Sequence, residues 1–281
     1  MRLVDAHAHV QADRFAGDLS DVLLAAAAAG VERLLVPGWN LASSRGAVAL
    51  AHAPAPGAPS IDAAVGIHPH EAAGAGPGRE EVAELAADPA VVAIGETGLD
   101  YDRAFSPRED QLVNLRWHLA LGRRTGKPVI LHCRSAPGLR DAQDDLVAEL
   151  RAAGAGDAAW RERLGGAPPA ILHSFSGPVD FAEAALELGL AIGFSGLVFR
   201  RGEEPSAQVA RIVPPDRLLV ETDSPYLSPP GAPKRRNEPS WVAVTARWVA
   251  AQRDVEPDAL GEALVPAYDA AFRTRTGEQW T

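Results

Sequence analysis

The sequence is poor in cysteine and has no long apolar run. Its single cysteine, Cys133, excludes an internal disulfide framework and favours a reducing, cytoplasmic setting. The chain enters an apolar strand pattern at once, without the basic and apolar regions of a signal peptide. The apolar stretch at residues 22–31 is too short to cross a bilayer and predicts a core helix. We therefore expect a cytoplasmic protein without membrane segments.

Lysine is also scarce: of the 27 lysine and arginine residues, only Lys127 and Lys234 are lysines. The 37 acidic residues bring the formal net charge to −10. This balance argues against a protein that coats nucleic acid through bulk electrostatics. It leaves room for an enzyme that holds a phosphate chain with metal ions and a few local arginines.

Short apolar runs of strand length alternate with helical patterns along the chain. This alternation is typical of a parallel sheet that helices cover on both faces. We predict helices at residues 19–29, 43–51, 80–87, 107–125, 139–152, 179–188, 206–212, 241–253 and 257–274. We predict eight strands, at residues 2–10, 32–37, 61–68, 91–95, 128–132, 170–173, 190–194 and 217–222.

Eight such units in 281 residues predict a closed (β/α)8 TIM barrel. Because no linker-like change of composition divides the chain, we expect a single domain over residues 1–281. An open, doubly wound sheet is the alternative. The glycine-, alanine- and proline-rich stretch at residues 72–78 opens no helix after a strand, so we discard a dinucleotide-binding loop.

The eight histidines are not scattered evenly. Chance would place about one of them at strand ends, if these ends make up about a tenth of a barrel chain. Barrel enzymes build their sites at the carboxyl ends of the strands, so clustering there predicts a site. Six histidines lie at or just after predicted strand ends: His7, His9, His68, His70, His132 and His173.

Acidic residues reach the same rim. Side chains alternate along a strand, so Asp5 shares a face with His7 and His9 and can orient their rings from below. Glu96 follows the fourth strand between glycines that allow close approach, and Asp223 follows the eighth. Helix capping or ion pairing explains either acid alone, but not their gathering with histidines.

Four imidazoles and two carboxylates are too many ligands for one tetrahedral zinc site. They suit two divalent ions about 3.5–4 Å apart, with Mg²⁺, Mn²⁺ and Zn²⁺ all open as candidates. Glu96 lies on the middle strand of the set and is our candidate for the bridging ligand, with Glu221 as a support below Asp223. A single open metal site is the alternative. The predicted ligands are His7, His9, Glu96, His132, His173 and Asp223.

These residues lie in an ordered series of motifs. Any one motif is weak, but the ordered set is highly specific and resembles the TatD family of metal-dependent hydrolases and deoxyribonucleases. The motifs are Asp5-Ala6-His7-Ala8-His9, Gly66-Ile67-His68-Pro69-His70, Gly95-Glu96-Thr97-Gly98-Leu99-Asp100-Tyr101, His132-Cys133-Arg134, His173-Ser174-Phe175-Ser176-Gly177, Glu221-Thr222-Asp223-Ser224-Pro225-Tyr226-Leu227 and Arg236-Asn237-Glu238-Pro239.

The resemblance implies the same six metal ligands and places His68 and Arg134 near the substrate. It implies hydrolysis of phosphodiester bonds in single-stranded DNA from the 3′ end, and no obligate protein partner is evident. Asp223 would hold a metal-activated water and accept its proton, while Glu96 bridges the two ions. Arg134 would help to neutralise the phosphoryl oxygens.

Two stretches depart from the family pattern. Ser135 and Ala136 follow Arg134, where family members usually carry an acid and an alanine. The connection between the fifth and sixth strands has an extra helical piece at residues 152–169. We expect both departures to touch the rim loops and to affect substrate choice. Cys133 alternates with its neighbours and is expected to be a packed thiol that faces the helices.

Two other functions stay open. The same activated water can attack a carboxylic ester or amide, such as an aminoacyl ester on tRNA. Related two-metal barrels often use a carbamylated lysine as the bridge, but Glu96 takes the corresponding strand here. A non-catalytic, metal-stabilised scaffold is disfavoured, because a closed structural site needs only four ligands.

Overall fold

The predicted strands are all present and form one parallel sheet in chain order. The computed structural model describes residues 1–272. Ala6 N donates to Val220 O at 3.0 Å and Asp223 N donates to His7 O at 2.8 Å, which joins the two edges of the sheet. This closure confirms the (β/α)8 barrel and excludes the open sheet. The strands are β1 (Leu3–Asp5), β2 (Val31–Pro37), β3 (Ser60–Val65), β4 (Val91–Asp100), β5 (Val129–Arg134), β6 (Ala170–Leu172), β7 (Ala191–Phe194) and β8 (Leu218–Val220).

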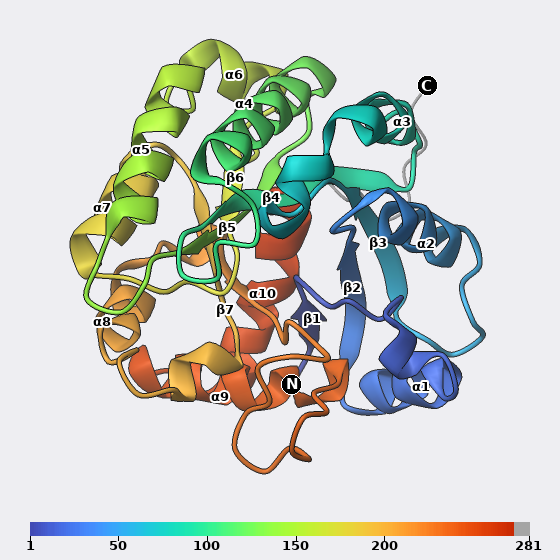
Figure 1. Cartoon of the computed structure of the whole chain (residues 1–281). Coiled ribbons are helices and arrows are strands. Elements are labelled where there is room, and N and C mark those ends of the chain that lie inside the picture. Colours follow the sequence, from blue (N-terminus) through green and yellow to red (C-terminus); the bar gives the residue numbers. More distant parts are fainter. Residues whose placement is uncertain (273–281) are drawn as a thin grey trace.

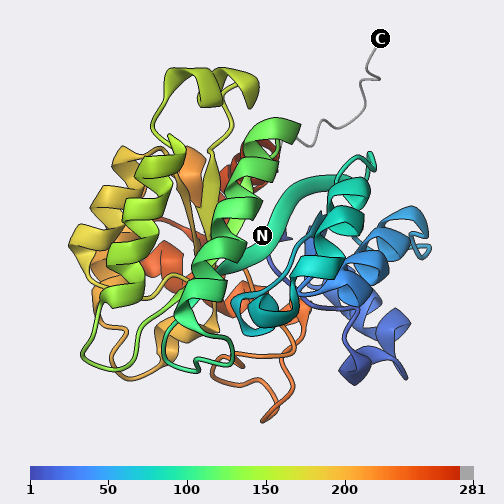
Figure 2. The same ribbon diagram turned by 45° about the horizontal axis from the view of Figure 1, so that its top comes forward.

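Helices surround the strands on the outside (Figures 1 and 2). All nine predicted helices are present, although the expected residues 273 and 274 of the last one lie outside the described part of the chain. No helix within residues 1–272 combines the length and the hydropathy that crossing a bilayer requires. The helices are α1 (Leu19–Ala28), α2 (Leu41–His52), α3 (Arg79–Leu85), α4 (Arg108–Thr125), α5 (Asp141–Ala153), α6 (Ala158–Arg163), α7 (Val179–Glu187), α8 (Pro205–Ile212), α9 (Val242–Gln252) and α10 (Pro257–Phe272).

Several strands differ from their predicted bounds, most clearly β1, β3 and β4. β1 ends at Asp5, five residues early. β3 ends at Val65, three residues early, and a 3-10 helix at Pro69–Gly74 follows it. β4 runs on to Asp100, although the apolar pattern predicts an end at Gly95. Glycine is uncommon inside strands, which is why the sequence pattern breaks there. Because of this extension, Glu96 lies within the strand and not after its end.

The extra helical piece, α6, does not touch the rim loops, and this expectation is wrong. It lies between α5 and β6, at the end of the barrel where strands begin, and Figure 2 shows it far from the mouth. Arg163 reaches Arg124 O at the end of α4 at 3.5 Å, and Trp160 is fully buried. The insertion therefore extends the packing of the closed end.

Helix α10 seals that closed end. Arg33 on β2 lies 2.8 Å from Asp62 on β3 and 3.0 Å from Asp269 on α10. Tyr268 donates its hydroxyl proton to Asp62 at 2.9 Å. Burial raises the pKa of Asp62 even though Arg33 opposes the shift, so desolvation outweighs the attraction. A group buried at such cost is strongly destabilising once its partner is removed.

We predict that Arg33→Met, which keeps the aliphatic stem but leaves Asp62 without its cation, lowers the free energy of unfolding by about 3 kcal/mol. Urea denaturation measures the change. Arg2→Met is the matched control, because Arg2 pairs with Glu32 and Glu262 at the surface and should change stability little. Equal effects of the two substitutions would contradict a structural role for the buried pair.

Candidate metal centre

Two histidines enter the mouth directly after β1. His9 N donates to Ser224 O at 2.8 Å, so the segment continues alongside the end of β8. Asp5 does not orient the imidazole rings as predicted. Its carboxylate accepts from Thr222 N at 2.9 Å, from Thr222 Oγ1 at 2.6 Å and from His7 N at 3.2 Å. Asp5 therefore fixes the backbone at the barrel seam and positions His7 indirectly.

A bulge in β4 brings Glu96 into the mouth. Between Ile94 and Thr97, β4 carries one residue more than β5, so the register shifts there. Gly95 and Gly98 have φ values of 142° and 135°, which favour glycine. A Cβ atom on Gly95 would lie 2.8 Å from a carbonyl oxygen of β5, and one on Gly98 would lie 2.0 Å from another. The two glycines thus allow the close strand approach that the sequence predicts.

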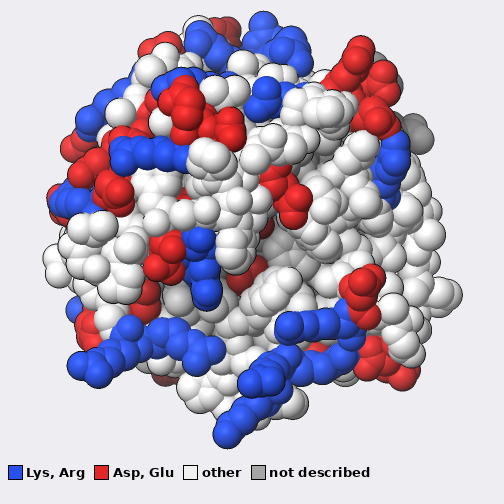
Figure 3. Space-filling view, in the orientation of Figure 1, with Lys and Arg blue, Asp and Glu red and all other residues white. Residues whose placement is uncertain are grey.

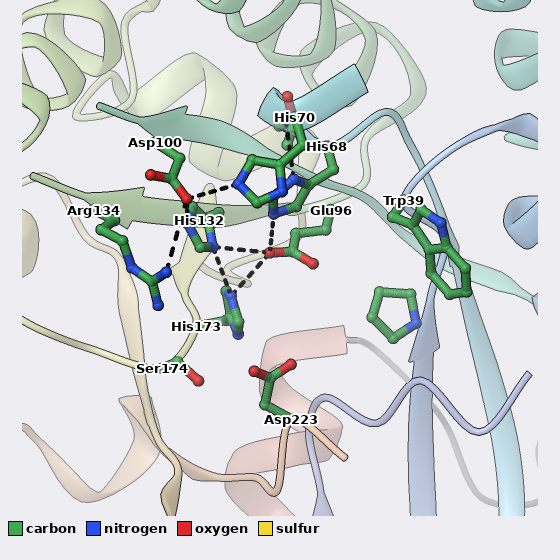
Figure 4. Close-up of polar contacts among 12 residues, drawn as sticks. Trp39, His68, His70, Glu96, Asp100, His132, Arg134, His173, Ser174 and Asp223 are labelled. Carbon is green, nitrogen blue, oxygen red and sulfur yellow. Dashed lines mark hydrogen bonds and ion pairs between the residues drawn. The ribbon is translucent and has the colours of Figure 1, made fainter. Parts of the chain in front are cut away.

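The carboxylate of Glu96 lies at the centre of the cluster and is only 2% exposed. Its Oε2 is 3.3 Å from His7 Nε2 and 3.6 Å from His9 Nε2. Its other oxygen faces the opposite histidines, as Figure 4 shows. Oε1 lies 2.9 Å from His173 Nε2, 3.2 Å from His132 Nδ1 and 3.3 Å from His68 Nε2. One carboxylate therefore faces two groups of imidazoles: Oε2 faces His7 and His9, and Oε1 faces His68, His132 and His173.

Asp223 completes the ring of donors. Its Oδ1 lies 3.5 Å from His9 Nε2 and 3.9 Å from His7 Nε2. Within each of three sets, all the ligand atoms lie within 4.8 Å of one another, a spacing compatible with a divalent cation. The sets are His7 with His9 and Asp223, His7 with Glu96 and His173, and His68 with Glu96 and His132.

Two histidine rings of the cluster are held by hydrogen bonds on the side away from the centre, as the rings of metal ligands commonly are. His9 Nδ1 lies 3.2 Å from Pro37 O and must donate to it, which leaves the lone pair on Nε2 facing the centre. His173 Nδ1 lies 3.2 Å from Glu221 Oε1, in the supporting position predicted for that acid. Rings held in this way by a carbonyl or a carboxylate are typical of metal-binding histidines.

The ionisation of the cluster favours cation binding. Burial would raise the pKa of Glu96, but the imidazoles of His173, His68 and His7 hold it well below its usual value. Burial lowers the pKa of His68 to about 4, so this ring is neutral. Its Nδ1 accepts from His70 N at 3.1 Å, which places the ring proton on Nε2, facing Glu96. Burial also opposes charge on His173, yet Glu96 and Glu221 raise its pKa well above the usual value. A cation that binds there must displace a proton.

The structure brings all six predicted ligands together and places His68 among them as well. His68 Nε2 lies 3.3 Å from Glu96 Oε1, and the substrate-binding role of His68 stays a prediction. Arg134 points into the mouth, and its nearest acid, Asp100, is 3.9 Å away. This separation is too long for a hydrogen bond, so the guanidinium is available to an anion. Burial raises the pKa of Cys133 well above its usual value, as expected for a packed thiol.

Sequence reasoning missed Asp100. Its Oδ2 lies 3.3 Å from His132 Nε2 and 2.8 Å from His70 Nε2, and the side chain is fully buried. Asp100 therefore holds the ring of His132 from behind. The sequence does carry a signal for Asp100: every second residue of a strand lies on the same face, so Asp100 shares a face with Glu96 and Gly98.

The segment Arg236-Asn237-Glu238-Pro239 also has a structural explanation. Asn237 Nδ2 donates to Thr222 O at 2.8 Å, which fixes the backbone next to Asp223. Arg236 lies 2.7 Å from Asp18 and stacks over the ring of Phe15 at 4.9 Å. The segment thus ties the loop after β8 to the start of α1.

Two adjoining cavities open from the cluster to the surface, at the hollowed centre of the face in Figure 3. The first, of about 490 Å³, is lined by Glu96, Asp223 and Arg134 together with aromatic side chains. The second, of about 470 Å³, continues past Arg134 to Ser135 and Glu203. Ser135 accepts a hydrogen bond from Ala142 N at 2.9 Å and so caps α5. The departure from the family pattern at this position therefore does reach the rim.

A family of proteins described as TatD related DNase matches this sequence over residues 4–273. The chain belongs to the TatD family. It is 38% identical over 266 residues to the 3′-5′ ssDNA/RNA exonuclease TatD of Erwinia billingiae, a match that covers 92% of this chain and 94% of the relative. It is also 34% identical over 256 residues to the uncharacterized metal-dependent hydrolase YabD of Bacillus subtilis, covering 90% and 92%.

Solved structures agree with the TatD fold. The crystal structure of YJJV, a TatD homolog from Escherichia coli K12, superposes with a TM-score of 0.82 at 28% identity and covers 98% of this chain and 99% of that one. A phosphotriesterase homology protein from Escherichia coli matches with a TM-score of 0.62 at 12% identity, over 97% and 99% of the chains. The second likeness concerns the barrel alone.

We predict that the wild type binds two divalent ions and that Glu96→Ala lowers this number to at most one, because each group of imidazoles loses the carboxylate oxygen that faces it. Elemental analysis after saturation with Mn²⁺ or Zn²⁺ and gel filtration measures the stoichiometry. Glu203→Ala is the control, since Glu203 lines the second cavity but belongs to none of the three ligand sets. Unchanged metal content in the Glu96 variant would remove this residue from the bridging role.

We further predict that Asp100→Asn weakens metal binding by about 10–100-fold while the protein stays folded, because the ring of His132 loses its carboxylate support. Titration with Zn²⁺ against a competing chelator gives the affinity. Asp102→Asn removes an exposed acid two residues away and should leave the affinity unchanged. If both variants bind metal as the wild type does, Asp100 does not support the site.

Proposed function

We propose that this TatD family protein is a metal-dependent hydrolase of phosphodiester bonds that shortens single-stranded DNA or RNA from the 3′ end. The observation that carries the proposal is the position of Glu96, whose two oxygens face separate imidazole groups next to Asp223 and an open cavity. Two cations about 3.5–4 Å apart with a shared carboxylate are typical of enzymes that transfer phosphoryl groups. The names of relatives such as the Erwinia billingiae exonuclease support the choice of substrate.

Divalent ions bound at this cluster would lower the pKa of a water molecule and neutralise charge on the phosphate. The protein's own residues supply the remaining steps. Asp223 lies at the outer side of the cluster, with its side chain 14% exposed, and accepts the proton of the attacking water. Arg134 holds a phosphoryl oxygen with its guanidinium. Glu96 keeps the two ligand groups at a fixed separation.

The negative charge of the protein does not oppose this function. Two divalent ions against the carboxylates of Glu96 and Asp223 leave the centre with a formal charge of 4 − 2 = +2, and Arg134 adds to it. The field of nearby charges acts over about 8 Å at physiological ionic strength, so distant surface acids contribute little. A phosphate chain therefore meets positive charge at the mouth of an acidic protein.

The test compares end-labelled single-stranded DNA, duplex DNA, RNA and aminoacylated tRNA in Mg²⁺, Mn²⁺ or Zn²⁺. We expect stepwise shortening of the single strands from the 3′ end by the wild type. Asp223→Asn keeps the shape of the side chain but removes its basicity, and should lower the rate by a factor of about 10² or more. Asp102→Asn again serves as the control.

Deacylation of the tRNA without cleavage of any polynucleotide would favour the ester or amide hydrolase. Metal binding without hydrolysis of any of these substrates would favour the scaffold. Near-normal turnover by the Asp223 variant would leave the phosphodiesterase in place but remove Asp223 as its base.

A further inference from the structure

Aromatic side chains gather on one wall of the first cavity. Trp39 follows β2 and Tyr226 follows Asp223, and both rings pack beside His9, with centroid distances of 5.3 Å and 6.1 Å. Among residues 1–272, only two large aromatic side chains are mostly exposed: Tyr226, at 51%, and Phe105, at 69%. Both line this cavity.

The local structure holds Trp39 in place. Asn40 and Ser43 form a reciprocal capping box at the start of α2, in which Ser43 N donates to Asn40 Oδ1 at 2.9 Å. The hydroxyl of Ser43 also accepts from Trp39 N at 2.8 Å. The backbone that carries the indole ring is therefore anchored on a helix end. A rigid aromatic surface loses little entropy when a ligand stacks on it.

Tyr226 is held in a similar way. Its backbone N–H donates to Asp223 O at 2.8 Å, so the ring keeps a fixed relation to the metal cluster. The guanidinium of Arg14 lies over the ring, 5.5 Å from its centroid. Arg14 in turn donates to Arg235 O at 3.3 Å, in a loop that also carries the exposed Lys234. Figure 3 shows positive side chains along this side of the hollow.

We propose that Trp39 and Tyr226 form a base-binding subsite, on which the nucleobase next to the scissile phosphate stacks. This inference rests on the proposed function. The cavity of about 490 Å³ has the size of a site for one small-molecule unit such as a nucleotide. Stacking on aromatic rings is tolerant of sequence, because every base has a flat face. The basic loop beside Tyr226 would contact the phosphate backbone of the nucleic acid.

The subsite also explains a preference for unpaired strands. Glu96 lies at the bottom of the mouth, 2% exposed, so the phosphate must descend between the rim loops to reach it. The neighbouring base then faces Trp39 and Tyr226 instead of a complementary strand. A duplex has to give up base pairs before it can occupy this position.

The experiment uses a single-stranded oligonucleotide and two versions in which an abasic residue replaces the last or the next-to-last nucleotide. We expect Trp39→Ala and Tyr226→Leu each to lower kcat/KM for the normal oligonucleotide by about 10-fold, mainly through KM, because one stacking contact is lost. Trp39→Phe should restore most of the loss. The metal content of each variant should equal that of the wild type, and Leu24→Ala tests an exposed apolar residue far from the mouth.

The decisive comparison is with the abasic substrates. On one of them the wild type should itself be slowed by about 10-fold, and Trp39→Ala should then add almost no further loss. Equal losses on normal and abasic substrates would mean that Trp39 acts as a scaffold, and would overturn the subsite. Wild-type rates in both variants would overturn it too, while the exonuclease function stands. Failure of the wild type to cleave any phosphodiester would remove both proposals.

Discussion

A carboxylate buried among imidazoles is the constraint on which the rest of the mouth depends. Glu96 stays ionised only because positive or polarisable groups surround it, since an isolated buried carboxylate is very costly. The bulge between Gly95 and Gly98 delivers it, and the hydrogen bonds of Asp100 and Glu221 hold the rings that face it. Each of these features has little use without the others. The cluster is consequently built as a unit that a cation completes.

The two ends of the barrel have different roles, one in stability and the other in the candidate site. The end where the strands begin carries a buried ion pair, the sealing helix α10 and the inserted helix α6, all of which serve stability. The rim where the strands end carries the donors, Arg134 and the aromatic wall. Because the two sets hardly touch, loops of the mouth can change without disturbing the closed end. This chain carries the helix α6 at the closed end and Ser135 at the rim, so its two departures from the family pattern lie at opposite ends of the barrel.

Much of this arrangement could be predicted from the sequence, because period and position carry it. The strand pattern predicts which residues lie near the ends of strands, and the closure of a barrel then brings His7 and Asp223 together from opposite ends of the chain. The place of α6 could also have been predicted, because a segment between a helix and the next strand lies at the end of the barrel where strands begin. Two features could not be predicted in this way. The pattern stops at Gly95 and so hides the continuation of β4 and the role of Asp100. Asp5 is bound by the backbone N–H and the hydroxyl of Thr222 across the seam, which no local pattern reveals.

The closure of the barrel has a consequence for synthesis of the protein. The donors span residues 7 to 223, and the first and last strands meet only when β8 is in place. On the ribosome, His7, His9 and Glu96 are synthesised long before Asp223. Non-local pairing of this kind is slow to form and exposes unpaired strand edges meanwhile. The nascent barrel thus carries an incomplete set of donors for most of its translation, and the intact centre reports that the whole barrel has closed.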